Sequence, residues 1–442
     1  MKNYLGYFSK NKEYRVIFTN SLYLILIKVA TYLVPLIIIP YLFKVIGAES
    51  YGRYVFVYSV IQYLLIGVEY GFQFSGTKSV AIIGSDKNKL SDLFSAIFYS
   101  RLIISFFISI LLIIIGFITN TEMKIFVFGS GIIFGTALLP LWLFQGKEKM
   151  QYITIVSIIP KLLTIVLTLI FVKNKEDYVF LTLFDSIGFL ISGIVGFLIA
   201  IKIFDIRIKK FNLIEVKTQL SNGWHVFLST ILISFYRQAN IIILSIVGNY
   251  TVVGYYSVAE KIVKAIQSAS TPITQAIFPY FSRKLNIENK HIFIGQFIKW
   301  GKIFAISFLS LTIIIMFLSK IIINLYLGKA FEQISVNLLI LSPIIFVGFL
   351  NYFYGIVGLM NLGHQKYFNR SILVAAIFNI ITCFILGYYL GDIGASISLL
   401  LAETLLFSLL IYYFKILESI NIFSYDKHYI SHNTNLQSTG KK

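Results

Sequence analysis

Residues 224–247 read WHVFLSTILISFYRQANIIILSIV, an almost uncharged run with one arginine near its centre. An α-helix needs about 20 residues to cross the hydrocarbon of a bilayer, so this run is long enough to span a membrane. Arg237 lies about 20 Å along such a helix from Trp224, close to the midplane. A charge at that depth is expensive, which indicates that the helix faces protein or water on one side.

The rest of the chain has the same character. Of its 442 residues, 57% are hydrophobic and only 13% are charged, a composition that could not cover the surface of a soluble domain. Apolar runs of spanning length recur from end to end, and they predict an all-α polytopic membrane protein with about twelve transmembrane helices. The predicted spans are 20–42, 54–72, 93–118, 125–145, 151–172, 178–202, 224–247, 252–276, 300–325, 335–360, 369–390 and 393–414.

The charge of the connecting segments predicts the orientation. If the N-terminus is cytoplasmic, the cytoplasmic connections hold most of the lysines and arginines, so we expect both termini in the cytoplasm. This bias explains much of the net charge of +19, and no nucleic-acid partner is expected. The single cysteine, Cys383, excludes an intrachain disulfide, and no His/Cys cluster suggests a metal or cofactor site.

The two halves of the chain repeat each other. YGRYVFVYSV (51–60) opens the second predicted span, and its counterpart VGYYSVAEKI (253–262) opens the eighth. Because each half has an even number of spans, both halves enter from the same side, which predicts a parallel repeat of two six-helix bundles around a cleft. The predicted domains are an N-terminal bundle (1–202), a basic cytoplasmic linker on the inner leaflet (203–223), a C-terminal bundle (224–414) and a polar cytoplasmic tail (415–442).

Several cations lie within the predicted spans, and such residues normally face a bundle interior or an aqueous cavity. Lys161 and Arg237 are too central to snorkel easily, so we expect them to line the cleft. Lys28 and Arg101 lie nearer the inner ends, where snorkelling and a lumenal role fit equally well. The polar stripe of the eighth span adds its lysines to the candidate anion-binding surface: Lys261 and Lys264.

Four acids are candidate coupling carboxylates or charge partners. Asp185 and Glu403 occupy broadly equivalent places in the two halves, and either role fits each of them. A structural role is favoured for Glu69, near the inner end of the second span. Glu260 lies four residues before Lys264, which predicts an ion pair within one helix. A cleft with surplus positive charge would attract an amphiphilic anion, such as a lipid-linked phosphate compound.

Four segments resemble the recurring motifs of Wzx-type O-antigen flippases, in the polysaccharide-transport branch of the multidrug/oligosaccharidyl-lipid/polysaccharide superfamily. They keep the family order, and the resemblance extends to about residue 415. The segments are GVEYGFQFSGTKSVA (67–81), LPLWLFQGKEKMQYIT (139–154), VGYYSVAEKIVKAIQSASTPITQAIFPYFSR (253–283) and IGASISLLLAE (393–403).

The resemblance implies a MATE-like fold in the bacterial inner membrane. The implied activity is transfer of an undecaprenyl-pyrophosphate-linked oligosaccharide from the cytoplasmic to the periplasmic leaflet by alternating access. Membrane lipid, H⁺ or Na⁺ as a coupling ion, and polysaccharide polymerase and chain-length proteins are the implied partners. The seventh span has Ala239 and Asn240 where many relatives carry an acid, so coupling carboxylates known elsewhere in the superfamily do not carry over to that helix.

Two other functions are compatible with a polytopic chain. A drug/cation antiporter of the same superfamily would need acids rather than surplus cations in its cleft. A membrane polysaccharide polymerase or ligase would need a substantial outside loop with catalytic groups, whereas the predicted outside connections are short. We therefore expect a flippase rather than an enzyme.

Overall fold

The computed structural model describes residues 12–119, 122–268 and 290–418, with 270, 274, 277, 278 and 281 as isolated positions between the last two ranges. Within the helices, the side chains of 12–21, 24, 229, 232–238 and 290–292 lie outside the described set. In the described part of the chain, nine helical segments are long and apolar enough to cross a membrane. The prediction of an all-α polytopic membrane protein is confirmed.

The first half of the chain forms long helices that coincide with its six predicted spans, and two short helices that the sequence did not predict. A left-handed turn at Tyr70 (φ 44°) and Gly71 (φ 76°) starts the first short helix, α4. Non-helical residues at Leu139 and Pro140 precede the second, α7. The helices are α2 (Lys12–Val45), α3 (Gly47–Glu69), α4 (Phe72–Ile83), α5 (Lys87–Ile118), α6 (Met123–Leu138), α7 (Leu141–Gly146), α8 (Met150–Phe171) and α9 (Val179–Phe204).

The second half likewise has a helix at each predicted span. Its last helix bends at Gly391 (φ 60°, ψ −131°), so its two arms correspond to the last two predicted spans. A π-helical segment, η3, precedes that helix, and such segments often occur near functional sites. The helices are α10 (Leu213–Val247), α11 (Tyr250–Gln267), α13 (Lys290–Tyr326), α14 (Ile334–Leu341), α15 (Pro343–Tyr352), η3 (Phe353–Met360) and α16 (Gln365–Glu418).

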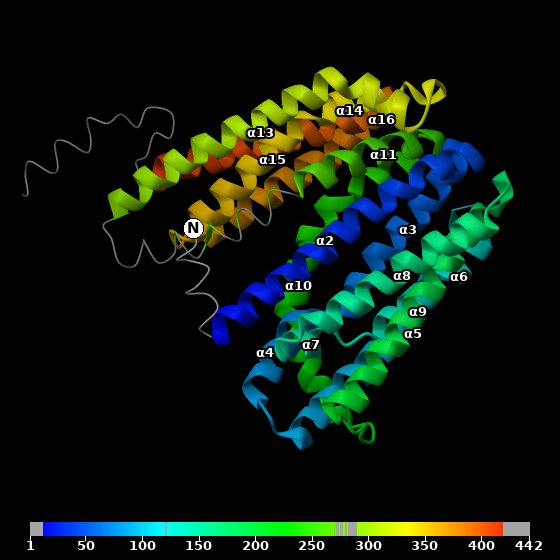
Figure 1. Ribbon diagram of the computed structural model, residues 1–442, viewed down its shortest axis with the longest axis vertical. Coiled ribbons are helices and arrows are strands. Elements are labelled where there is room, and N and C mark those ends of the chain that lie inside the picture. The colour runs from blue at the N-terminus through cyan, green and yellow to red at the C-terminus, as the bar shows by residue number, and fades with distance from the viewer. Residues whose placement is uncertain are drawn as a thin grey trace, which may run out of the picture.

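Figure 1 shows how these helices are grouped. Helices α13 to α16 lie together with α11, and α5, α6, α8 and α9 form a second group. Helices α2 and α10 run diagonally between the two groups, and α3 packs against both α11 and α6. The groups therefore meet mainly along α2, α3, α10 and α11.

The contact between α3 and α11 is symmetrical. A methyl group on Gly52 would lie 1.7 Å from the carbonyl oxygen of Tyr250, and one on Gly254 would lie 2.3 Å from the carbonyl oxygen of Ala48. Ala48 and Tyr250 each precede the glycine of their own helix by four residues, so the backbones meet in a reciprocal contact that only glycine permits. The two glycines hold the same place in the repeated segments 51–60 and 253–262. We call this contact the α3–α11 crossing.

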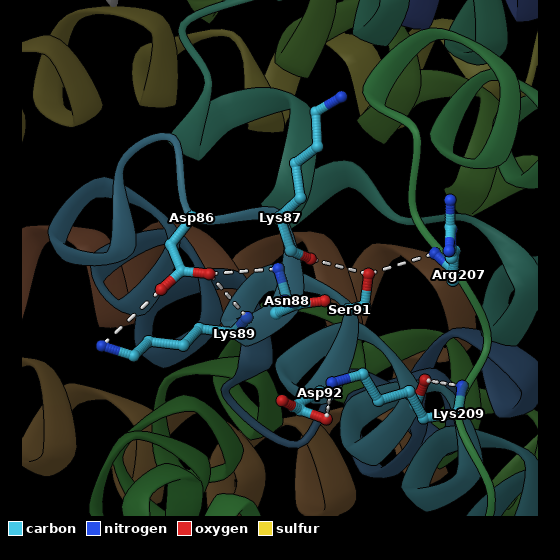
Figure 2. A network of polar contacts seen from close by, with 9 residues as sticks. Asp86, Lys87, Asn88, Lys89, Ser91, Asp92, Arg207 and Lys209 are labelled. Carbon is cyan, nitrogen blue, oxygen red and sulfur yellow. Dashed lines mark hydrogen bonds and ion pairs between the residues drawn. The ribbon is translucent and has the colours of Figure 1, made fainter.

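The segment between the halves differs from the predicted linker. Residues 205–212 form an extended strap along α5, because the N–H of Arg207 donates to Ser91 Oγ (3.1 Å) and the N–H of Lys209 donates to Ser95 Oγ (2.8 Å). Figure 2 shows the strap beside the start of α5, with Lys209 Nζ 2.6 Å from a carboxylate oxygen of Asp92. Helix α10 then begins at Leu213, within the predicted linker and before Trp224. The helix is longer than predicted because polar residues at its start are tolerated outside the hydrocarbon.

Candidate functional site: a cavity lined by lysines and tyrosines

A cavity of about 520 Å³ lies between α2, α3, α8 and α9, with α11 forming part of its wall. This volume falls in the usual range of ligand sites, roughly 300–1,000 Å³. The wall combines apolar side chains with charged and phenolic groups. The charged residues are Glu69, Lys161, Asp185, Lys261 and Lys264, and the tyrosines are Tyr32, Tyr51, Tyr54 and Tyr58.

Helix α3 supplies one continuous face of this wall. Residues three or four apart lie on one side of an α-helix, so this spacing directs a whole stripe of side chains into the cavity. Its tyrosine rings follow each other, with centroids of Tyr51 and Tyr54 6.2 Å apart and those of Tyr54 and Tyr58 5.9 Å apart. These tyrosines were not among the predicted site residues, although their 3–4 residue spacing is visible in the sequence. The stripe consists of Tyr51, Tyr54, Tyr58, Gln62, Leu65 and Glu69.

Lys161 lies on α8 and lines the cavity, as predicted from its central place in the span. Its ammonium group donates to Thr31 Oγ1 (3.0 Å) and to the carbonyl oxygen of Ser157 (3.1 Å). Both acceptors are uncharged, and an ammonium group has three donors. Lys161 can therefore give a hydrogen bond and a full positive charge to an anion in the cavity.

Asp185 is buried on α9 at the cavity wall. Its carboxylate accepts hydrogen bonds from the hydroxyls of Tyr54 (2.7 Å) and Thr164 (2.8 Å). These donors come from α3 and α8, so the acid joins three helices of the first half. The arrangement fits both roles considered for Asp185. As a charge partner, its negative charge would offset that of the cavity lysines, and as a coupling carboxylate, it is accessible from the cavity.

Helix α11 brings two lysines of the second half to the same cavity. Lys264 Nζ lies 2.9 Å from Glu260 Oε1, which confirms the predicted ion pair within one helix. Glu260 is buried and also accepts from the hydroxyl of Tyr256 (3.1 Å). Lys261 instead reaches across to the first half, where its ammonium donates to Tyr51 Oη (2.7 Å) and lies 5.0 Å from the centre of that ring.

Arg101 is buried and supports the chain rather than the cavity wall. Its guanidinium donates to the carbonyl oxygens of Leu139 (2.7 Å) and Thr136 (2.6 Å), where α6 ends. Each carbonyl also accepts from a backbone N–H, that of Leu139 for Thr136 and that of Leu141 for Leu139, so the arginine adds a second donor at this helix end. It lines a small adjoining pocket with Glu69, which also borders the main cavity.

The remaining predicted residues are placed elsewhere or not described. Lys28 is half-buried on α2 but is not on the described cavity wall. Glu403 lies on α16, where the amide of Asn351 donates to its carboxylate (2.6 Å), so it does not share the environment of Asp185. The side chain of Arg237 lies outside the described residues. The described wall thus carries three lysines and two carboxylates, a smaller positive surplus than the sequence suggested.

A buried amide network in the second half was also missed. Asn379 Nδ2 donates to Asn240 Oδ1 (2.7 Å), and Asn240 Nδ2 donates to Tyr256 Oη (3.0 Å). The hydroxyl of Ser398 donates to Asn379 Oδ1 (3.1 Å), and the hydroxyl oxygens of Thr382 and Ser398 are hydrogen-bonded at 2.6 Å. The network connects α10, α11 and both arms of α16 through groups that satisfy one another. Isolated asparagines in apolar spans were the available signal.

The fold and the cavity are those of a multi-pass helical membrane protein with a cavity of ligand size. The structure resembles that of the lipid II flippase MurJ in an inward closed conformation, with a TM-score of 0.71 and 15% identity over 88% of this chain and 87% of that one. It also resembles an inward-facing MATE multidrug transporter, with a TM-score of 0.64 and 13% identity over 91% and 96% of the two chains. The expectation of a MATE-like fold is confirmed.

The sequence comparisons identify the family. Residues 17–285 match the family described as polysaccharide biosynthesis protein. A candidate O-antigen transporter of Escherichia coli K12 is 30% identical over 398 residues, which cover 89% of this chain and 95% of the relative. One from Shigella dysenteriae is 29% identical over 403 residues, 88% and 97% of the two chains. The chain belongs to this family of polysaccharide biosynthesis proteins.

Proposed function

We propose that this protein transfers an undecaprenyl-pyrophosphate-linked oligosaccharide from the cytoplasmic to the periplasmic leaflet of the bacterial inner membrane. The observation that carries the proposal is the cavity lined by Lys161, Lys261 and Lys264 beside a stripe of tyrosines. The substrate class is supported by relatives named as candidate O-antigen transporters and by the structural likeness to a lipid II flippase.

The chemistry of the wall fits the parts of such a substrate. Ammonium groups bind phosphate oxygens as charge-assisted donors, so the lysines would hold the pyrophosphate. Tyrosine rings and hydroxyls offer apolar faces and hydrogen bonds to sugars. The isoprenoid tail is as apolar as the bilayer, and it would stay in lipid while the head group crosses by alternating access.

The proposed topology has twelve spans in two bundles. Nine segments meet the length and hydropathy of a span; one of them, α16, counts as two spans because of its bend, and α10 and α11 bring the total to twelve. The strap at 205–212 and the start of α5 carry several lysines, which supports a cytoplasmic position for this end of the molecule under the positive-inside rule. Both termini would then be cytoplasmic, with the bundle boundary in the strap and the first turns of α10.

Lys161→Met tests the anion site. The change keeps a long apolar side chain but removes the charge, and we expect transport to fall at least about tenfold, the equivalent of 1.4 kcal/mol of lost interaction. The measurement is translocation of the lipid-linked repeat unit into inverted membrane vesicles, normalised to protein in the membrane. Lys28→Met is the matched control, because it removes a lysine of α2 that is not on the described wall. Unimpaired transport by Lys161→Met would refute the anion site.

Arg237 is predicted to share this role. Arg237→Lys should keep part of the transport because the charge remains, although the bidentate fork is lost. Arg237→Ala should lose most of it, and Arg237→Glu should be worse because it repels the head group. If the arginine instead neutralises a buried acid, Arg237→Ala should lower the amount of protein, and a second change that neutralises the acid should restore it.

An antiporter for cationic drugs is the second candidate, because Asp185 and Glu69 place two acids on the cavity wall. Coupling to H⁺ or Na⁺ through Asp185 would be compatible with either function. Efflux of a cationic dye from vesicles that contain the protein, without translocation of the lipid-linked saccharide, would favour the antiporter.

A further inference from the structure

The two lysines of α11 hold different partners in the structure. Lys264 pairs with the buried Glu260 of its own helix, whereas Lys261 bonds Tyr51 on α3 in the other half. Tyr51 directly precedes Gly52, so the Lys261–Tyr51 bond lies at the α3–α11 crossing, where the two backbones touch. A change of partner at Lys261 would therefore act on the contact that joins the halves.

Glu260 directly precedes Lys261 and lies four residues before Lys264, and it interacts electrostatically with both lysines. Its side chain is 7% exposed, while that of Lys264 is 37% exposed and lines the cavity. An anion entering the cavity can thus reach Lys264 but not Glu260. If the anion takes Lys264, the carboxylate keeps the Tyr256 hydrogen bond but loses its cation, and a buried acid without its cation is costly.

We propose, on the basis of the proposed function, that Glu260 is an internal counter-anion that the substrate pyrophosphate displaces from Lys264, and that the displaced carboxylate draws Lys261 away from Tyr51. The α3–α11 crossing then loses the bond beside its two glycines, and the halves can part at that end. Substrate binding would thereby favour the conformation that releases the substrate.

Asp185 is the other acid that interacts with Lys261, from the side of the first half. The hydroxyls of Tyr54 and Thr164 already donate to its carboxylate, and these hydrogen bonds do not depend on whether an anion binds Lys264. When an anion binds Lys264, Glu260 loses the cation of its ion pair. Lys261 is therefore attracted more strongly toward Glu260 on α11, which is away from Tyr51 on α3.

The test combines binding with a distance between the halves. Full-length protein in nanodiscs, with Cys383→Ala, carries spin labels at Lys124→Cys and Lys329→Cys, two exposed positions on α6 and η2 (Lys329–Phe331) in different halves. Undecaprenyl pyrophosphate is the probe, its binding is followed by native mass spectrometry, and the label separation is followed by electron-electron resonance. We expect a longer distance to appear in the parent protein when the probe binds.

Glu260→Gln should separate this proposal from a structural role. Without the internal competitor, we expect the probe to bind about threefold more tightly, because it no longer has to displace a carboxylate from Lys264. The longer distance should nevertheless not appear, since nothing draws Lys261 from Tyr51. Weaker binding, or the same lengthening as in the parent, would overturn the proposal.

Lys264→Gln should have the opposite effect. It leaves Glu260 without this cation, so the longer distance should appear without the probe, and the double variant with Glu260→Gln should return to the short distance. A short distance in Lys264→Gln alone would mean that Glu260 takes up a proton instead, which contradicts the proposal.

Lys261→Met removes the bond to Tyr51 directly, so the longer distance between the labels should appear with or without the other substitutions. A short distance in Lys261→Met would contradict the proposal, and this measurement remains available if the Glu260→Gln protein does not accumulate. Failure of the parent protein to bind the probe would instead count against the proposed function.

Discussion

The two halves of the chain treat buried polar groups in opposite ways. In the first half, Lys161 and Asp185 face a cavity, where each keeps bonding capacity or charge that a ligand can meet. In the second half, Asn240 and Asn379 are bonded to each other and to hydroxyls, away from that cavity. Polar groups that satisfy one another stabilise a single packing, whereas polar groups that face a cavity can change partner.

Aromatic packing reinforces this difference. The rings of Phe297 and Phe353 stack with centroids 4.7 Å apart, and those of Phe308 and Phe349 stack at 4.4 Å. These phenylalanines fill the second half, whereas the tyrosines of α3 border an open volume in the first. We infer that the first half meets the substrate and that the second half acts as a more rigid body, whose described residues reach the cavity through α11.

The largest expected contrast concerns the equivalent acids of the two halves. Asp185→Asn should reduce transport at least about tenfold, a loss of roughly 1.4 kcal/mol, because it removes a charge from the cavity wall while keeping the side chain's size. Glu403→Gln should leave transport within about twofold, because its carboxylate is bonded to Asn351 in the second half. Vesicle translocation per molecule of membrane protein measures both. Equal losses of transport in the two variants would show that Asp185 and Glu403 have the same role in the two halves.

The next effect concerns the amide network and should appear in stability rather than transport. Asn379→Ala removes the donor to Asn240 Oδ1 and the acceptor of Ser398, and leaving buried polar groups unpaired costs about 1–3 kcal/mol. The melting temperature in detergent should fall, while transport per folded molecule should stay near that of the parent. Ser310→Ala on the exposed face of α13 is the control. Normal stability with lost transport would instead give the network a direct part in transport.

The smallest expected effect lies outside the membrane, at the exposed ion pair of Lys87 and Asp205. Lys87 Nζ donates to the Asp205 carboxylate (2.7 Å), and this bond holds the pKa of Asp205 below its usual value. A lowered folded-state pKa adds stability above the unfolded pKa, about 3.9, and this stability is lost as the pH falls through the folded value. Asp205→Asn should therefore lower the melting temperature slightly at pH 7, and the difference should shrink as the pH falls below about 3.9. A larger drop in melting temperature at low pH would contradict the lowered pKa of Asp205 in the folded protein.

The sequence by itself determined the positions of the long apolar helices and the contacts within one helix. Apolar length fixes a span because it must match the hydrocarbon, and helical spacing fixes the Glu260–Lys264 pair because residues four apart are neighbours on one helix. The same spacing contained the tyrosine stripe of α3. The family motifs added the fold, which the structural likenesses confirm.

Only the tertiary structure decided which charges face the cavity and what holds the halves together. The sequence left Lys28 with both a snorkelling and a lumenal role, and the structure shows that Lys161 but not Lys28 lies on the described cavity wall. The carbonyl partners of Arg101 and the contact of Gly52 with Tyr250 join segments far apart in the sequence. Such contacts depend on how helices rotate and cross, and the periodicity of a single helix does not contain that information, because packing between helices sets it.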